Sequence, residues 1–301
     1  MHRAELVPSH LNNQSDRQNA SEPPAYEQWT GMGAPPGLFM SLPHSGRYYP
    51  PSFLEQTRFT AQTIRVTEDA YVDELIGFGD ELGLYAQRGV YGRAYIDLNR
   101  DPLELDGRLI TDRLPKTALS GSARVLHGFG VVPRCLKPGQ DIYIKGLKLA
   151  EVQARLIAIH APYHRALQAL CQQARGVNGH VLWLDWHSGP SSAFLLSGKK
   201  QSDVVIGDFN GQACDKGLRD RVKSIFERNG FVVALNQPFA GGYTTQYYGR
   251  PEHKQHVLQI EINRSLYLDE AQIVKTEGFA GLKAKLKAVI EELKSLVRPI
   301  S

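Results

Sequence analysis

The chain has 301 residues, of which 42% are hydrophobic and 22% charged, a composition typical of globular proteins and unlike that of disordered or fibrous chains. The net charge of +4 is mild and spread along the sequence, without the basic and aromatic stripe of nucleic-acid-binding proteins, so we expect no nucleic-acid partner. No apolar run approaches the roughly 18 residues that span a bilayer, so we expect no membrane partner.

The N-terminal segment differs in composition from the rest of the chain. Residues 1–36 are polar, contain several prolines and show neither a helical nor a strand period, so we predict a mobile arm there. Residues 37–301 are predicted to form a single α/β domain. Short apolar runs rich in branched residues predict its strands. The predicted strands are Leu38–Leu42, Ala94–Leu98, Asp141–Ile144, Val181–Leu184, Val204–Ile206, Phe231–Leu235 and Val257–Ile262.

Longer segments with one apolar face separate these strands and predict helices. They run over Val152–Leu170, with a kink expected at Pro162, over Leu218–Phe226, and over Leu282–Val297 at the C-terminal end. Alternating strands and helices predict a mainly parallel sheet with helices on both faces. Such sheets bind ligands beyond the carboxyl ends of their strands.

Two histidines directly follow predicted strands. His44 lies in the turn Pro43–Gly46, and His187 repeats the arrangement in the segment Leu184–Ser188, where Asp185 is suited to orient an imidazole. Each histidine either offers a ring nitrogen to a metal or hydrogen-bonds within its own loop. A catalytic zinc site needs about three protein ligands and an open position, commonly two histidines and one carboxylate.

The missing carboxylate has two candidates in the segment Thr67–Leu75, which we predict to open a helix. Asp69 and Asp73 are one helical turn apart and share a face there. Either acid is a possible ligand. The alternative is that both only complement the helix dipole.

An asparagine and an arginine emerge together from another predicted strand. The guanidinium of Arg100 beside the amide of Asn99 suits bidentate capture of a substrate carboxylate. The alternative is that Arg100 forms an ion pair with Asp97 or Asp101.

Glu261 alternates with apolar residues on the predicted strand Val257–Ile262. A buried carboxylate is costly unless it is paired or functional, and a general base needs a desolvated acid of this kind. The alternative is a buried ion pair with Arg264. The preceding glycine-rich segment Asn236–Tyr243 lacks the features of a nucleotide-binding loop, so we interpret it as a loop that covers the substrate.

Cysteine usage and the N-terminal residues bear on the compartment. The three cysteines, Cys135, Cys171 and Cys214, are odd in number and form no CxxC pair, so we expect reduced thiols. Charged residues within residues 1–20 interrupt any apolar centre of a signal peptide. We therefore expect a cytoplasmic protein.

These segments together resemble the N-formylglutamate amidohydrolase family. The motifs PHSG, DxxVDEL, YIDLNR, YH, LDWHS, VVIGD, NQPFAGGY and LQIEINRSLY occur in the order and approximate spacing of that family, from about Leu38 to Glu270. The resemblance implies a zinc carboxypeptidase-like fold, a three-layer αβα sandwich with a mixed, mostly parallel sheet. It also implies zinc-dependent hydrolysis of N-formyl-L-glutamate to formate and L-glutamate.

The resemblance also implies roles for individual residues. His44 and His187 would be the imidazole ligands of the zinc. Arg47 stands where the carboxypeptidase pattern HxxE has its acid, so Asp69 is the implied third ligand and Asp73 the alternative. In the same comparison Asn99 and Arg100 would hold a substrate carboxylate and Glu261 would be the catalytic base. Arg93, Arg100 or Arg264 would stabilise the oxyanion or the substrate's carboxylates.

Two other functions remain open at this point. One is the same chemistry on another N-acyl amino acid or a small peptide, because pocket shape sets specificity. The other is a metal-free protein that binds an acidic amino acid. His44, His187 and Glu261 favour the enzyme, since a binding protein has no need of a base on a buried strand.

Overall fold

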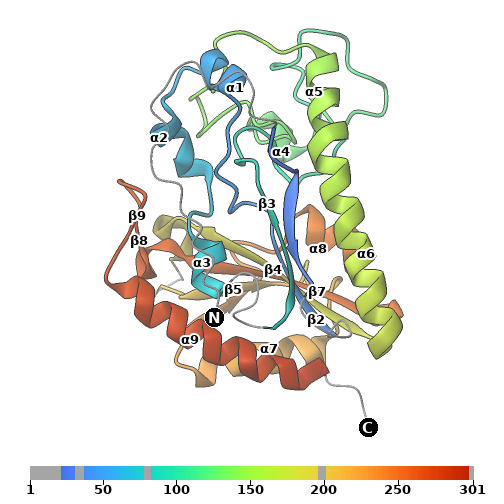
Figure 1. The fold of residues 1–301 in the computed structure, drawn as a ribbon, viewed down its shortest axis with the longest axis vertical. Coiled ribbons are helices and arrows are strands. Elements are labelled where there is room, and N and C mark those ends of the chain that lie inside the picture. The colour runs from blue at the N-terminus through green and yellow to red at the C-terminus, as the bar shows by residue number, and fades with distance from the viewer. Residues whose placement is uncertain (1–21, 31–36, 78–82, 196–200, 298–301) are drawn as a thin grey trace, which may run out of the picture.

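A single mixed sheet organises the molecule. The computed structural model describes residues 22–30, 37–77, 83–195 and 201–297, and Figure 1 shows the chain as a ribbon. The strands are β1 (Tyr26–Trp29), β2 (Leu38–Leu42), β3 (Tyr85–Gly89), β4 (Val181–Gly189), β5 (Val204–Gly207), β6 (Val233–Leu235), β7 (Gln255–Asn263), β8 (Leu268–Asp269) and β9 (Val274–Lys275).

The order of the main sheet is β1-β3-β2-β4-β7-β5-β6, and β8 pairs separately with β9. β1 runs antiparallel to β3, and β5 runs antiparallel to β7, whereas β3, β2, β4 and β7 are parallel to one another and β6 is parallel to β5. The predicted mixed, mostly parallel sheet is therefore confirmed.

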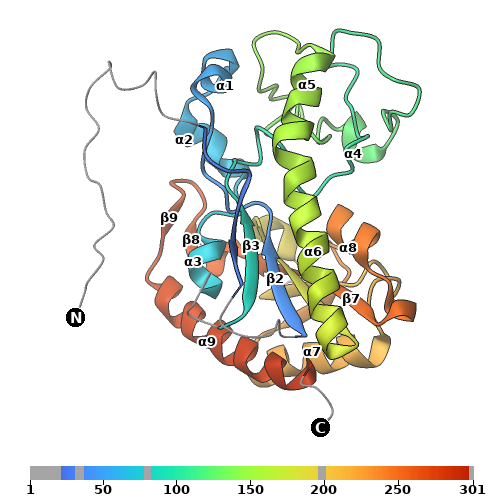
Figure 2. The ribbon, with the colours of Figure 1, turned by 45° about the vertical axis from the view of Figure 1, so that its right-hand side comes forward.

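Helices cover both faces of this sheet. They are α1 (Pro51–Gln56), α2 (Ala61–Ile64), α3 (Val72–Ile76), α4 (Ala123–Leu126), α5 (Leu149–Arg155), α6 (Ala161–Asn178), α7 (Lys216–Arg228), α8 (Tyr243–Tyr248) and α9 (Gly278–Leu293). Figure 1 shows α7 and α9 on one side of the sheet, and Figure 2 shows α6 crossing the opposite face at β2 and β3.

Alternation along β2 explains why both faces are covered. Leu38, Met40 and Leu42 point into a core shared with α3, α7 and α9, whereas Phe39 points into a second core shared with α6. Successive side chains of a strand face opposite sides, so a strand that is buried at every position, as β2 is, needs packing partners on both faces. The three-layer αβα architecture follows from this pattern and agrees with the prediction.

Two predicted strands do not form. Ala94–Leu98 and Asp141–Ile144 lie in a long connection, residues 90–148, that consists mostly of turns and has α4 as its only helix. Most of their apolar residues are buried, with Ile144 exposed, but they pack in the core that includes α6 residues instead of joining the sheet. An apolar run predicts burial in both cases, and periodicity alone does not separate a strand from a buried irregular segment.

A strand lies inside the segment predicted to be a mobile arm. Tyr26–Trp29 form β1, which pairs with β3 at the edge of the sheet, so ordered structure begins before the expected start near Gly37. β3 itself was not predicted, because Gln87 and Arg88 break its apolar pattern. Residues 1–21 and 31–36 of the predicted arm lie outside the described residues. The division into an arm and one domain over 37–301 stays a prediction.

The predicted helices form with local differences. The Val152–Leu170 segment runs through α5 and α6, with a π-helical stretch, Leu156–His160, immediately before Pro162, where the missing N–H of proline disturbs regular pairing. Thr67–Leu75 is not one helix. A 3-10 turn ends at Thr67, and α3 begins only at Val72, so Asp69 lies between them.

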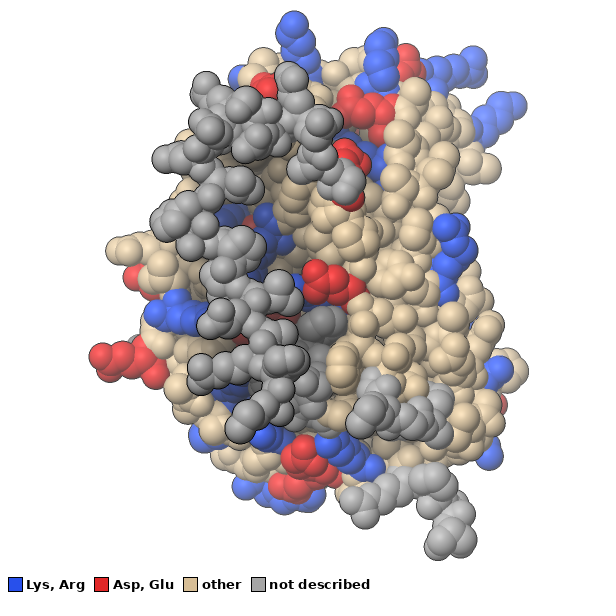
Figure 3. Space-filling model, viewed as in Figure 1, with Lys and Arg blue, Asp and Glu red and all other residues tan. Residues whose placement is uncertain are grey.

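The surface mixes charges of both signs. On the face shown in Figure 3, basic and acidic side chains are interspersed over the described part of the molecule. None of the helices in the described ranges is long and apolar enough to cross a membrane.

Candidate metal centre

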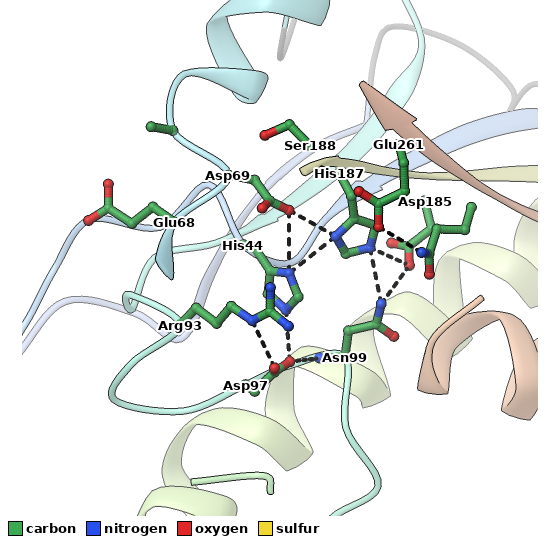
Figure 4. A network of polar contacts seen from close by, with 12 residues as sticks. His44, Glu68, Asp69, Arg93, Asp97, Asn99, Asp185, His187, Ser188 and Glu261 are labelled. Atoms are coloured by element: carbon green, nitrogen blue, oxygen red, sulfur yellow. Dashed lines mark hydrogen bonds and ion pairs between the residues drawn. The ribbon is translucent and has the colours of Figure 1, made fainter. Parts of the chain in front are cut away.

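Three ligand atoms converge at the ends of the central strands. His44 lies two residues after β2, His187 lies within β4, and Asp69 lies in the connection before α3. The Nδ1 atoms of the two histidines are 3.1 Å apart, and Asp69 Oδ2 lies 2.9 Å from His187 Nδ1 and 3.4 Å from His44 Nδ1 (Figure 4). All three side chains are buried. His44, Asp69 and His187 could hold a metal ion, and we call them the metal-ligand group.

Carboxylates orient both imidazole rings of this group from outside. His44 Nε2 lies 2.8 Å from Asp97 Oδ1, and His187 Nε2 lies 3.0 Å from Asp185 Oδ2. Asp185 is held in turn by the hydroxyl of Ser41. A carboxylate behind a histidine fixes the proton on the outer nitrogen and leaves the inner nitrogen free to bind a metal. Asp185 therefore makes the contact that the sequence suggested for it.

Asp69 reaches the histidines because its backbone and side chain are both fixed. Its amide donates to the carbonyl of His44 at 3.0 Å, and its Oδ1 accepts a hydrogen bond from Arg264 at 3.0 Å. Asp73, the alternative acid, lies elsewhere and forms ion pairs with Arg47 and Arg88. The structure thus brings Asp69, and not Asp73, to the two histidines.

The donor set requires a positive charge at its centre. When Asp97 and Asp185 each accept the outer N–H of a histidine, the lone pairs of His44 Nδ1, His187 Nδ1 and Asp69 Oδ2 face one another. A metal ion would replace this repulsion by coordination. The separations of 2.9, 3.1 and 3.4 Å are close to the edge of about 3.3 Å expected for a tetrahedron with zinc–nitrogen distances of roughly 2.0–2.1 Å.

Charge in the group supports the same conclusion. Burial opposes ionisation of Asp69, but hydrogen bonds and charge from His187 and His44 hold the pKa of its carboxyl well below the usual range. Burial also disfavours a charged His187, yet Asp185 and Asp69 raise the pKa of that imidazole well above its ordinary value. The surroundings therefore favour a cation between these side chains, as a proton or as a metal ion.

The metal-ligand group lines a cavity of ≈ 440 Å³. Glu261 also lines it from β7, in register with His187 on the neighbouring strand β4. Its Oε1 accepts a hydrogen bond from Gln259 at 2.8 Å. Burial raises the pKa of Glu261 to about 7, although the charge of His187 partly offsets this. A carboxyl with a pKa near neutrality beside a metal site is suited to accept and return protons.

The ion pair between Glu261 and Arg264 that the sequence left open does not form. Arg264 donates to the hydroxyl and carbonyl of Ser188, to the carbonyls of Val66 and Glu68, and to Asp69. These contacts engage all three of its guanidinium nitrogens. Its predicted contact with substrate stays a prediction, but its visible role is to hold Asp69.

Asn99, Arg93 and Arg100 lie on the same cavity, on the irregular segment 90–148. Asn99 Oδ1 accepts the amide of Thr244 at 2.8 Å, and its Nδ2 lies 3.0 Å from His187 Nε2. Gly242 permits this contact, because a Cβ there would lie 2.3 Å from the Asn99 side chain. Residues 238–242 of the predicted covering loop line the cavity, and Asn99 joins this loop to the metal-ligand group.

Arg93 and Arg100 both contact Asp97. Arg93 Nε lies 2.9 Å from Asp97 Oδ2, and Arg100 Nε lies 3.8 Å from the same oxygen while donating to the carbonyl of Phe129. The alternative ion pair of Arg100 with Asp97 is thus present as a long contact. Arg100 still lines the cavity despite this contact.

Two residues of the site were not identified from the sequence. The sequence suggested Asp97 only as an ion-pair partner of Arg100. Its position between the apolar residues Ile96 and Leu98 is nevertheless a signal, because a carboxylate in a buried segment needs a partner or a function. Arg124, on α4, lines the cavity and had no sequence signal, because the segment around it has neither a strand nor a helical period.

Comparisons with known proteins agree with this site. The model of a family described as N-formylglutamate amidohydrolase matches residues 37–268. An N-formylglutamate deformylase of Pseudomonas aeruginosa is 28% identical over 263 residues, which cover 85% of this chain and 90% of that protein. Another from Pseudomonas putida is 29% identical over 238 residues, covering 78% and 83%.

Solved structures give the same picture. The crystal structure of an N-formylglutamate amidohydrolase from Ralstonia eutropha superposes with a TM-score of 0.84 at 31% identity and covers 91% of this chain and 98% of that one. A protein of Agrobacterium tumefaciens superposes with a TM-score of 0.61 at 16% identity, over 91% of this chain and 96% of that one, and shows likeness of fold alone.

Proposed function

Because the chain belongs to the N-formylglutamate amidohydrolase family, we propose that it hydrolyses the formyl amide of N-formyl-L-glutamate to formate and L-glutamate with a bound zinc ion. One observation carries the proposal. His44, Asp69 and His187 aim three lone pairs at one point on the cavity, beside the carboxyl of Glu261.

The chemistry of the donor set favours zinc. Two imidazole nitrogens and one carboxylate oxygen are common ligands of catalytic zinc, which keeps a further position open. A zinc ion bound there supplies a Lewis acid that polarises the formyl carbonyl and makes water more acidic. Asp97 and Asp185 strengthen the two imidazoles as ligands by accepting their outer protons.

Glu261 is proposed as the general base. Its Oε1 is occupied by Gln259, and its Oε2 has no hydrogen-bond partner among the described residues, so Oε2 is the oxygen that accepts a proton from water. The same oxygen then delivers the proton to the leaving nitrogen. A pKa of about 7, raised by burial, allows transfer in both directions near neutral pH.

Arg93 and Arg100, with Asn99, are proposed to bind a substrate carboxylate. The two arginines keep guanidinium nitrogens without a hydrogen-bond partner in the described part of the chain: Arg93 uses only Nε, on Asp97, and Arg100 uses Nε and one terminal nitrogen on backbone carbonyls. Asn99 is already engaged, since its Oδ1 accepts the amide of Thr244 and its Nδ2 donates to Asp185 Oδ2 at 3.4 Å, so we assign it chiefly to orientation of the site.

A panel of substrates tests the proposal. N-formyl, N-acetyl and N-succinyl derivatives of glutamate and of neutral amino acids are assayed for release of free amine, with and without a chelator. We expect N-formyl-L-glutamate to give the highest kcat/KM and the chelator to abolish turnover. A higher kcat/KM for another acyl group would assign the same chemistry to a different N-acyl amino acid.

A further inference from the structure

Beyond the metal-ligand group, the cavity is lined by more basic than acidic side chains. Arg93, Arg100 and Arg124 all line it, and we call these three residues the arginine wall. Arg93 and Arg100 share the carboxylate of Asp97. Arg124 forms no ion pair in the described part of the chain, and its guanidinium makes one hydrogen bond there, from a terminal nitrogen to the carbonyl of Gly241 at 3.1 Å.

The position of Arg124 is fixed from its own helix. Ser122 caps α4 by accepting the amide of Val125 at 3.2 Å, and the hydroxyl of Ser122 donates to Glu104 Oε1 at 2.8 Å. Glu104 is itself buried. The contact with Gly241 adds a second anchor, in the loop that covers the cavity. A capped helix and a tethered guanidinium therefore hold Arg124 at the cavity with nitrogens to spare.

The three arginines lie close enough to repel one another. Burial, together with the charges of Arg93 and Arg124, lowers the pKa of Arg100 to about 10 against the opposing effect of Asp97. Such a cluster is costly in the absence of an anion, and a ligand with two carboxylates offsets it.

Not every arginine of the cavity is available to such a ligand. Arg264 uses all of its guanidinium nitrogens on Ser188, Asp69 and backbone carbonyls, so it has no free nitrogen for a second anion.

N-formylglutamate has an α-carboxylate near the scissile amide and a side-chain carboxylate farther away. Arg93 and Arg100 adjoin Asp97, which holds His44, and are therefore connected to the metal-ligand group. Arg124 is joined instead to the covering loop and also lines a neighbouring cavity of ≈ 280 Å³.

We propose that Arg124 is a specificity-determining residue that binds the side-chain carboxylate of the substrate, while Arg93 and Arg100 bind the α-carboxylate. This inference rests on the proposed function and extends it by naming the group that selects glutamate over neutral amino acids.

The test compares two substrates on one enzyme preparation. N-formyl-L-glutamine has nearly the shape of N-formyl-L-glutamate but lacks the side-chain charge, so the ratio of their kcat/KM values reports recognition of that charge. In Arg124→Gln we expect this ratio to fall roughly 10- to 100-fold, mainly through KM for the glutamate substrate, as for loss of a charged hydrogen bond. Arg124→Lys should give an intermediate ratio, because lysine keeps the positive charge but cannot donate two parallel hydrogen bonds to a carboxylate.

The matched control is Arg250→Gln. Arg250 lines the neighbouring cavity but not the one with the metal-ligand group, and it contacts only backbone carbonyls at the end of α8. We expect its substrate ratio to equal that of the wild type, which excludes a general effect of net charge. If Arg124 only tethers Gly241, Arg124→Gln slows both substrates equally and the ratio stays unchanged, which overturns the inference.

The same assay distinguishes a failure of the proposed function from a failure of the role assigned to Arg124. Wild-type enzyme that releases no formate from N-formyl-L-glutamate refutes the proposed function, and the inference about Arg124 with it. Wild-type enzyme that prefers the glutamate substrate, together with an Arg124→Gln variant that keeps this preference, refutes the role of Arg124 alone.

Discussion

The two sides of the cavity are built in different ways. On one side, strands β4 and β7 place His187 and Glu261 by their register, and His44 follows directly on β2. On the other side, the arginine wall is carried by the irregular segment 90–148, whose shape depends on turns, caps and single hydrogen bonds. The sheet side holds the groups we assign to bond cleavage, and the irregular side holds those we assign to substrate recognition.

This difference predicts which substitutions should affect catalysis and which should affect specificity. Side chains on paired central strands have little freedom to move, so a change in their chemistry is felt directly in catalysis. A segment of turns is easier to alter during evolution without loss of the fold, so it is the natural carrier of specificity. Asp97 crosses between the two sides, because it contacts both His44 and Arg93.

The largest effect should come from the sheet side. His187→Ala or His44→Ala removes one of three ligands, so we expect loss of bound zinc and a fall in turnover on the order of 10⁴-fold. Metal analysis and formate release on the same preparation measure both. Asp73→Asn is the control, since Asp73 pairs with Arg47 and Arg88 away from the group. Full zinc occupancy in Asp69→Ala with loss in Asp73→Asn would show that the acid is wrongly assigned.

Glu261→Gln should separate catalysis from folding. The carboxyl has no ion-pair partner among the described residues, so the substitution leaves no opposite charge stranded, and we expect the thermal midpoint and zinc content to persist. Turnover should fall roughly 10²- to 10⁴-fold, the usual contribution of an acid–base group. A stable variant with near-normal turnover would refute the assignment of Glu261 as the base.

Asp97→Asn probes the connection between the two sides. Loss of the charge behind His44 should weaken zinc binding roughly 10- to 100-fold, and it should also raise KM because Arg93 and Arg100 lose their shared anchor. Competition with a metal indicator and steady-state kinetics measure the two effects. Asp112→Asn is the control, because Asp112 is a partly exposed acid on the same segment that pairs with Lys148 and does not line the cavity. A change in KM alone, with zinc affinity intact, would mean that His44 is oriented without Asp97.

The smallest effect concerns stability at low pH. His164 supports the irregular segment, since its Nε2 lies 2.9 Å from the carbonyl of Leu98 and its Nδ1 lies 3.0 Å from Tyr248 Oη. Burial, and then the charge of His160, lowers the pKa of His164 to about 3. The folded protein therefore holds this imidazole neutral, whereas the unfolded chain binds a proton below about pH 6.5.

The resulting stabilisation is complete above pH 6.5 and declines as the pH falls toward 3. At pH 5 the loss amounts to ~2 kcal/mol. In His164→Gln the free energy of unfolding, measured with denaturant at pH 8 and pH 5, should depend less on pH by about that amount. An equal pH dependence in variant and wild type would show that His164 is not kept neutral by the fold.

Sequence patterns predicted the sheet side better than the irregular side, for physical reasons. His44 and His187 were identifiable because apolar runs locate strands, and the carboxyl ends of parallel strands meet at one edge of a sheet. The choice of Asp69 over Asp73 came only from the family resemblance. In space it depends on a turn fixed by the carbonyl of His44 and by Arg264, which lies far along the chain.

The position of Arg124 could not be predicted from sequence patterns. Its place at the cavity depends on a single-turn helix, a serine cap and a contact with Gly241, none of which leaves a periodic signal. The strand predicted over Ala94–Leu98 does not form for a related reason, since burial in the core with α6 imposes the same apolar composition as a strand. Tertiary contacts, not local propensity, decide the conformation of this segment.

The zinc content of the active enzyme tests the central claim most directly. Protein purified without added metal is analysed for transition metals and assayed for formate release from N-formyl-L-glutamate, before and after treatment with a strong chelator and after return of zinc. We predict about one zinc per chain, loss of activity with loss of the metal, and recovery when zinc is returned. Full activity in protein that contains no stoichiometric transition metal would contradict the assignment of His44, Asp69 and His187 as its ligands.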